Sequence, residues 1–159
     1  MHWPTRRGAK RRPFIGPRWS GTGELPALEN LFELPHKLSL PREQYFTVQQ
    51  IYAGWELFGI AILIQAVSLA MLAWRSTREH YIFRPVMAAL ILLMLAQIMF
   101  WLFTFPANSL TDNWTRMPAD WDMLRHQWEY SHAIGAICQL LGLCCLVGAL
   151  FARVRASGR

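Results

Sequence analysis

Charged residues are scarce in this chain, which argues against an ordinary soluble domain. Asp, Glu, Lys and Arg make up 16% of the 159 residues, whereas soluble domains carry about 25%. Hydrophobic residues reach 53% and include 8 Trp and 9 Phe. The length suits a single domain. Together these values indicate a membrane protein.

Several common frameworks are also missing. The chain has 3 cysteines, all within one apolar run and without a CxxC pair, so no disulfide framework is expected. No apolar stretch directly follows the basic residues near the N-terminus, so we predict no secretory signal. Nothing resembles a phosphate loop, a dinucleotide fingerprint, a haem attachment motif or a nucleophile elbow. No internal repeat supports a transporter.

The first 44 residues differ from the rest in composition. Residues 1–26 are basic and rich in Pro and Gly, and we predict that they are disordered. In a hydrophobic chain such a segment suits lipid headgroups or topology control better than nucleic acid, and no nucleic acid partner is expected. Residues 27–44 form an amphipathic segment. We predict that Pro35 breaks it and that it lies on the membrane surface.

Three long apolar runs follow, at about residues 46–74, 85–105 and 130–152. Each has about 20 residues or more, enough to cross a hydrocarbon core of about 30 Å. The sequence therefore predicts an all-α, polytopic membrane helical bundle over residues 45–155, with three transmembrane helices. The third belongs to one long helix from Met117 to Phe151 that extends out of the membrane. Gln65, Gln97 and Gln139 within these runs are expected to hydrogen-bond between helices.

Charge in the loops predicts the topology. The arginines of the loop 75–84 and of the C-terminus place both on the cytoplasmic side of an inner membrane. Three spans then put the most basic segment, residues 1–26, outside. Either that segment is exported regardless, or a first transmembrane helix is absent from this version of the chain. We favour the second explanation.

The first third of the long helix carries the candidate site. Trp121, Arg125, Trp128 and His132 are spaced 4, 3 and 4 residues apart, so they form one stripe, and Glu129 lies about 40° from it. The stripe ends where the apolar run begins. A cation, a carboxylate and an imidazole therefore converge near a membrane interface.

His132 is the candidate general base, with Glu129 or Arg125 setting its protonation. The alternative is a structural histidine bonded to a neighbouring helix. The Glu129-x-x-His132 spacing also occurs in carboxylate-bridged metal sites. Those sites need further carboxylates, and Glu56 is the only acid well inside an apolar span, so we expect neither a metal nor a cofactor.

The remaining candidates each have two interpretations. Glu56 is a functional intramembrane acid paired with Arg125 or His132, or a hydrated residue near the interface. Arg125 pairs with Glu129 or stabilises an anion. Trp121 and Trp128 anchor the interface or stack on a ligand. Two further residues complete the predicted binding set: Tyr52, which shares a face with Glu56, and Asn108, which caps a turn or holds a loop over the stripe.

From about Leu31 onward the chain resembles a bacterial family of small integral membrane proteins, the anthrone oxygenase-like family. The likeness rests on four motifs: Leu34-Pro35-His36-Lys37-Leu38, Tyr52-Ala53-Gly54-Trp55, Phe105-Pro106-Ala107-Asn108, and Trp121-x3-Arg125-x2-Trp128-Glu129-x2-His132-Ala133. The resemblance implies four helices, with an apolar helix before the Leu-Pro-His segment, where this chain has a basic, proline-rich stretch. Some family members oxidise anthrones to anthraquinones with dioxygen, without metal or flavin; most have unknown functions.

Two classes of function stay open. The first is a cofactor-independent oxidase or oxygenase of a lipophilic aromatic, in which His132 removes a proton and Arg125 stabilises the anion. The second is a non-enzymatic accessory or structural subunit of a membrane complex, or a homo-oligomer. Convergence of Arg125, Glu129, His132 and Glu56 would favour the first, because an accessory bundle has little need for such a cluster.

Overall fold

The computed structural model describes residues 26–158, with side chains described for 32–55 and 57–158. Within that part, every regular element is a helix or helical turn, which confirms the all-α prediction. In chain order the elements are α1 (Pro26–Ser39), α2 (Arg42–Gln49), η1 (Gln50–Tyr52), η2 (Trp55–Leu57), α3 (Phe58–Arg75), α4 (His80–Met99), η3 (Phe100–Thr104), α5 (Phe105–Leu110) and α6 (Trp121–Ser157). Apart from Pro26, the segment predicted to be disordered lies outside the described residues.

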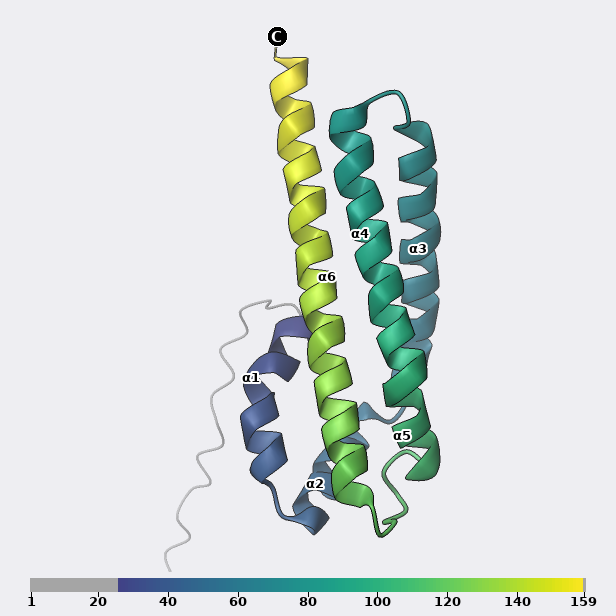
Figure 1. Ribbon diagram of the computed structural model, residues 1–159, viewed down its shortest axis with the longest axis vertical. Coiled ribbons are helices and arrows are strands. Elements are labelled where there is room, and N and C mark those ends of the chain that lie inside the picture. The colour runs from purple at the N-terminus through teal and green to yellow at the C-terminus, as the bar shows by residue number, and fades with distance from the viewer. Residues whose placement is uncertain (1–25, 159) are drawn as a thin grey trace, which may run out of the picture.

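Three helical segments are long and apolar enough to cross a membrane: Phe58–Arg75, His80–Leu110 and Trp121–Ser157. They run side by side, while α1 and α2 pack near the N-terminal part of α6 (Figure 1). Large apolar side chains, such as Leu63, Ile64 and Leu150, are more than half exposed, as lipid-facing residues should be. The chain is therefore a polytopic helical membrane protein, as predicted.

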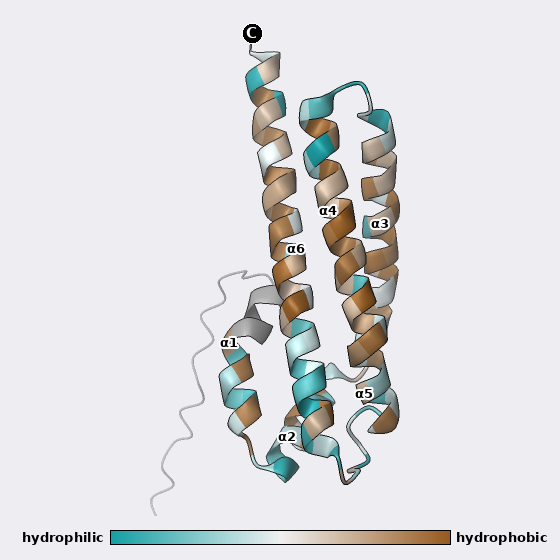
Figure 2. Cartoon of the chain, in the orientation of Figure 1, coloured by the Kyte–Doolittle hydropathy of each residue, from teal (hydrophilic) through white to brown (hydrophobic). Residues whose placement is uncertain are grey.

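The helix α6 has 37 residues, about 55 Å at roughly 1.5 Å per residue. That length exceeds a hydrocarbon core of about 30 Å. Its N-terminal third is hydrophilic and the middle is apolar (Figure 2). It begins at Trp121 with Asp120 as its N-cap residue, slightly later than the predicted start at Met117.

The first predicted span, 46–74, is not one helix in the structure. α2 ends at Gln49, two short 3₁₀ turns follow, and α3 begins only at Phe58. Between those turns Gly54 has a φ of 86°. This left-handed conformation costs glycine little, whereas it strains other residues. The predicted span took in the end of α2, whose sequence REQYFTVQ is largely polar, whereas the apolar helix α3 begins only at Phe58.

The predicted break at Pro35 is wrong. α1 continues through Pro35 from Pro26 to Ser39 and packs against α6. Proline removes one backbone donor from a helix, but Pro35 is exposed while Lys37, on the packed side, is only 4% exposed. Contact with α6 therefore keeps α1 continuous across Pro35 despite the missing hydrogen bond.

The second span extends beyond its predicted end at residue 105. α4 passes through the π-helical turn η3 into α5, which carries Pro106 near its start. Proline removes one backbone hydrogen bond from a continuous helix, and the π-helical turn directly before it is where the regular hydrogen-bond ladder changes. The chain then reverses through Asp112, Asn113 and Trp114, all at positive φ. This reversal places Trp114 in an aromatic cluster with Tyr45, Phe46 and Trp128.

Candidate functional site

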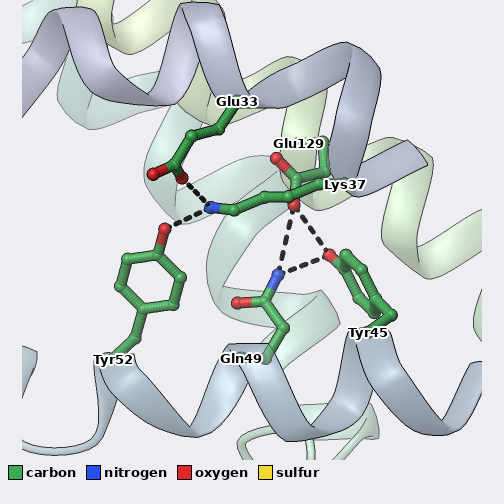
Figure 3. Close-up of polar contacts among 6 residues, drawn as sticks. All are labelled: Glu33, Lys37, Tyr45, Gln49, Tyr52 and Glu129. Atoms are coloured by element: carbon green, nitrogen blue, oxygen red, sulfur yellow. Dashed lines mark hydrogen bonds and ion pairs between the residues drawn. The ribbon is translucent and has the colours of Figure 1, made fainter. Parts of the chain in front are cut away.

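A buried carboxylate, that of Glu129 on α6, lies at the centre of the polar contacts near this aromatic cluster. The hydroxyl of Tyr45 donates to Oε1 of Glu129 at 3.0 Å, and the amide of Gln49 donates to the same oxygen at 3.2 Å. The Gln49 amide also donates to the Tyr45 hydroxyl (Figure 3). Tyr45 and Gln49 are four residues apart on α2, so both side chains reach α6 from one face. All three residues are at most 2% exposed.

Tyr45 is held as a neutral donor. Burial first, and the nearby Glu129 carboxylate second, raise the pKa of its hydroxyl far above the ordinary tyrosine value. The hydroxyl therefore keeps its proton at neutral pH, and its hydrogen bond to Glu129 persists.

Tyr45, Gln49 and Glu129, which we call the Glu129 cluster, lie among buried polar atoms that have no hydrogen-bond partner. Among the described residues, four buried side-chain atoms make no hydrogen bond: Oε1 of Gln49, Nε of Arg125, Nε1 of Trp128 and Oε2 of Glu129. All four belong to the Glu129 cluster or to its neighbours on α6. A buried polar atom without a partner costs about 1–3 kcal/mol. Several unpaired polar atoms so close together are typical of a site where a bound ligand or water supplies the missing hydrogen bonds.

A buried lysine from α1 borders the cluster. Nζ of Lys37 lies 2.8 Å from the Glu33 carboxylate and donates to the Tyr52 hydroxyl (Figure 3). It also lies 4.7 Å from the ring centroid of Tyr52 and 5.7 Å from that of Trp128. Burial lowers the pKa of Lys37, but the contacts with Glu33 and Tyr52 outweigh it, so the pKa ends above its ordinary value. Lys37 is therefore an ammonium ion among aromatic rings.

Arg125 does not pair with Glu129, so that predicted pairing is wrong. Its guanidinium instead contacts the Asp122 carboxylate and donates to the Leu40 carbonyl at 2.9 Å. It also packs over the ring of Trp121, with 4.7 Å to the centroid. Asp122 lies one turn before Arg125 and nearer the end of α6, which draws the guanidinium away from Glu129. Arg125 thus ties the segment after α1 to α6.

His132 lies one turn beyond the cluster. Its Nδ1 is 3.3 Å from the Trp128 carbonyl and 3.5 Å from the Thr104 hydroxyl. Its ring stacks on Trp128, with 3.8 Å between the centroids. Within the described part of the chain, His132 contacts neither Glu129 nor Arg125 through a hydrogen bond or ion pair. Among the described residues, the imidazole therefore contacts Trp128 and Thr104 and not the Glu129 carboxylate.

The other predicted residues have separate positions. The side-chain oxygen of Asn108 accepts a hydrogen bond from the Trp114 indole at 3.0 Å, so Asn108 holds the loop after α5. Trp121 packs against Tyr45, with 6.5 Å between the ring centroids. Tyr52 packs against Trp128 at 5.2 Å. Glu56 belongs to η2, but its side chain lies outside the described residues.

Sequence reasoning did not select Lys37, Tyr45 and Gln49 as site residues. One signal could have found each. Glu33 and Lys37 are four residues apart on an amphipathic helix, the spacing of a helical ion pair. Tyr45, Gln49 and Tyr52 are spaced 4 and 3 apart, which places them on one face.

Fold and cluster together define a small polytopic helical membrane protein with a buried ionisable cluster at one end of its bundle. No group of three or more His, Cys, Asp or Glu side chains that could hold a metal ion occurs among the described residues. Comparison of the chain with protein-family models, curated proteins and solved structures finds no match. The resemblance to the anthrone oxygenase-like family therefore stays a prediction.

Proposed function

We propose that this protein is a membrane oxidase that joins dioxygen directly to a lipophilic aromatic such as an anthrone, with Glu129 as the base. The Glu129 carboxylate carries the proposal. One oxygen is held by the neutral donors Tyr45 and Gln49, and the other has no partner. A positioned, buried oxygen of this kind can accept a proton from a bound molecule.

Lys37 supplies the charge that such a reaction needs. Removing a proton from the CH₂ group of an anthrone leaves an anion that is delocalised through the aromatic rings onto the ketone oxygen. A preorganised ammonium ion in a desolvated site stabilises that developing charge. Lys37 stays charged and lies against the rings of Tyr52 and Trp128, so the ammonium ion is held beside the Glu129 cluster among aromatic side chains.

The chemistry balances without a cofactor. Glu129 takes a proton from the substrate CH₂ group, and the carbanion passes one electron to dioxygen. The resulting radical and superoxide combine to form a C–O bond, and the peroxide takes the proton back from Glu129. Loss of water from the hydroperoxide then leaves a new carbonyl. Overall, an anthrone and dioxygen become an anthraquinone and water.

In this proposal His132 positions the ring of Trp128 rather than acting as the base. The stacked contact and the bonds to Thr104 and the Trp128 carbonyl fix the imidazole beside the indole. The general base role therefore passes from the predicted His132 to its neighbour Glu129, one turn nearer the start of α6.

The accessory-subunit hypothesis is supported by the way the same hydrogen bonds join different helices. The bonds from Tyr45 and Gln49 to Glu129, and from Arg125 to the Leu40 carbonyl, fasten α2 and the end of α1 to α6. A cluster that serves only to fasten helices would explain them without chemistry.

We also propose an inner-membrane location with the loop 75–84 and the C-terminus in the cytoplasm. Arg75, Arg78 and Arg84, around the loop between α3 and α4, are exposed, as are Arg153 and Arg155 near the C-terminus. Figure 1 shows that loop and the C-terminus at the same end of the bundle. Cytoplasmic ends carry such arginine excess. The Glu129 cluster lies toward the other end, so it faces the outer side of that membrane.

The test is anthrone oxidation by the purified chain in lipid nanodiscs, followed by dioxygen uptake and anthraquinone absorbance. Glu129→Gln keeps the size and the acceptor oxygen but cannot take up a proton, so we expect a rate at least about 100-fold lower with the helical content by circular dichroism unchanged at the assay temperature. Glu43→Gln is the matched control, because Glu43 is an exposed carboxylate on α2. Wild-type turnover no faster than empty nanodiscs would reject the oxidase in favour of the accessory subunit.

A further inference from the structure

A second polar feature lies deep in the membrane-spanning part of the bundle. Gln65 is near the middle of α3, and Gln139 is near the middle of the apolar part of α6. Both side chains are exposed, and neither makes a hydrogen bond within the part of the chain that the structure describes. The expected hydrogen bonds between helices are therefore not formed by these two amides.

Both glutamines line the same cavity. It lies between α3, α4 and α6, has a volume of about 160 Å³, and is bounded by Gln65, Leu69, Ala89, Leu93, Gln139 and Gly142, among others. α6 approaches α4 closely at one wall, where a Cβ built on Gly142 would lie 3.7 Å from the Ala89 backbone. The cavity is thus an apolar space with two amide groups on its sides.

These amides need partners that bulk lipid cannot supply. A polar group without a hydrogen bond costs several kcal/mol in hydrocarbon, where there is no water. Acyl chains carry neither donors nor acceptors at the depth of the bilayer centre. The partner must therefore bring a hydrogen-bonding group to this depth and have an otherwise apolar surface.

The size of the cavity limits the occupant. An apolar protein cavity of roughly 150 Å³ accepts a molecule such as benzene, so about 160 Å³ suits one or two fused rings. We propose that this cavity binds a small lipophilic ring compound that bears a hydroxyl or carbonyl group, hydrogen-bonded by Gln65 and Gln139. The site is separate from the Glu129 cluster, because ten residues of α6 between Glu129 and Gln139 span about 15 Å. It does not depend on the proposed oxidase activity.

The probe is radiolabelled 1-naphthol, measured by equilibrium dialysis against the protein in nanodiscs with empty nanodiscs subtracted. We expect saturable binding of one molecule per chain. Naphthalene has the same rings without the hydroxyl, so it should compete at least threefold more weakly. Gln65→Leu and Gln139→Leu should each raise the Kd about threefold to tenfold, the effect of one neutral hydrogen bond. Helical content by circular dichroism verifies that each variant folds.

Gln97→Leu is the matched control. Gln97 is likewise a glutamine in a membrane-spanning helix, partly buried, but it is not among the residues that line the cavity. Its substitution should leave the Kd unchanged. Absence of saturable binding, or equal binding by all three variants, would overturn the proposal. So would a dimer that dissociates in Gln65→Leu and Gln139→Leu, because a second copy would then be the partner of these amides.

Discussion

Replacing Tyr45 by Phe tests the central contact of the Glu129 cluster. The substitution removes one hydroxyl from a residue with no exposed surface. It deletes the 3.0 Å bond to Glu129 and the acceptor that the Gln49 amide uses. Gln49 is then the one remaining donor to the Glu129 carboxylate among the described residues.

The expected cost is about 2 kcal/mol of unfolding free energy, because hydrogen bonds to charged groups contribute about 1.5–3 kcal/mol. The ring of Tyr45 stays, so its packing on Trp114, with 5.1 Å between centroids, is kept. Tyr130→Phe is the matched control: Tyr130 is 51% exposed on α6, and its loss of a hydroxyl should cost less than about 0.5 kcal/mol.

The assay is reversible unfolding by sodium dodecyl sulfate in mixed micelles, followed by circular dichroism. Glu129→Gln and the double variant complete a cycle, in which we expect a coupling energy of about 1 kcal/mol or more between Tyr45 and Glu129. If Tyr45→Phe costs no more than Tyr130→Phe, the hydroxyl and the carboxylate do not form the contact described above.

Two further predictions concern the backbone and the pH response. Gly54→Ala should cost about 1–2 kcal/mol of unfolding free energy, because alanine is strained at a φ of 86°. The control is Gly59→Ala in α3, which has open space around its Cβ and should be neutral or stabilising. Thermal melts distinguish the two variants, and equal effects would contradict the left-handed turn. The pKa of Lys37 is raised above 10.5 in the folded chain, so its contribution to stability is complete below that pH and is lost as the pH rises through the raised value. The difference in unfolding free energy between wild type and Lys37→Met should therefore be constant from neutral pH to about pH 10 and shrink above it; a difference that fades near pH 7 would show that Lys37 is not held as a cation.

Hydropathy predicted the number of membrane-spanning helices, because a helix that crosses the lipid core must be apolar over about 20 residues. It did not predict where the first of them begins. The predicted start at residue 46 fell within α2, which is largely polar, and the apolar helix begins only after the turn at Gly54. The break expected at Pro35 was wrong because tertiary contact with α6 outweighs the loss of one backbone hydrogen bond.

The stripe on α6 was predicted from helical spacing, because 100° per residue places Arg125, Trp128 and Glu129 next to one another on the helix surface. Their partners could not be found in that way. Tyr45 and Gln49 reach Glu129 from α2, and a pairing across 80 or more residues depends on how α2 docks on α6. The predicted partner of Glu129 was the nearest cation in sequence, Arg125, which the structure commits to Asp122 instead.

The short length of α3 bears on which membranes suit this protein. Its 18 residues span about 27 Å at roughly 1.5 Å per residue, whereas α6 is about twice that length. In a bilayer whose hydrocarbon core is thicker than about 27 Å, α3 could not reach both interfaces. The lipid next to α3 would then have to thin, at a cost of a fraction of a kcal/mol for each Å of mismatch. Bilayer thickness therefore acts on this protein chiefly through α3, which favours sorting to thin membranes.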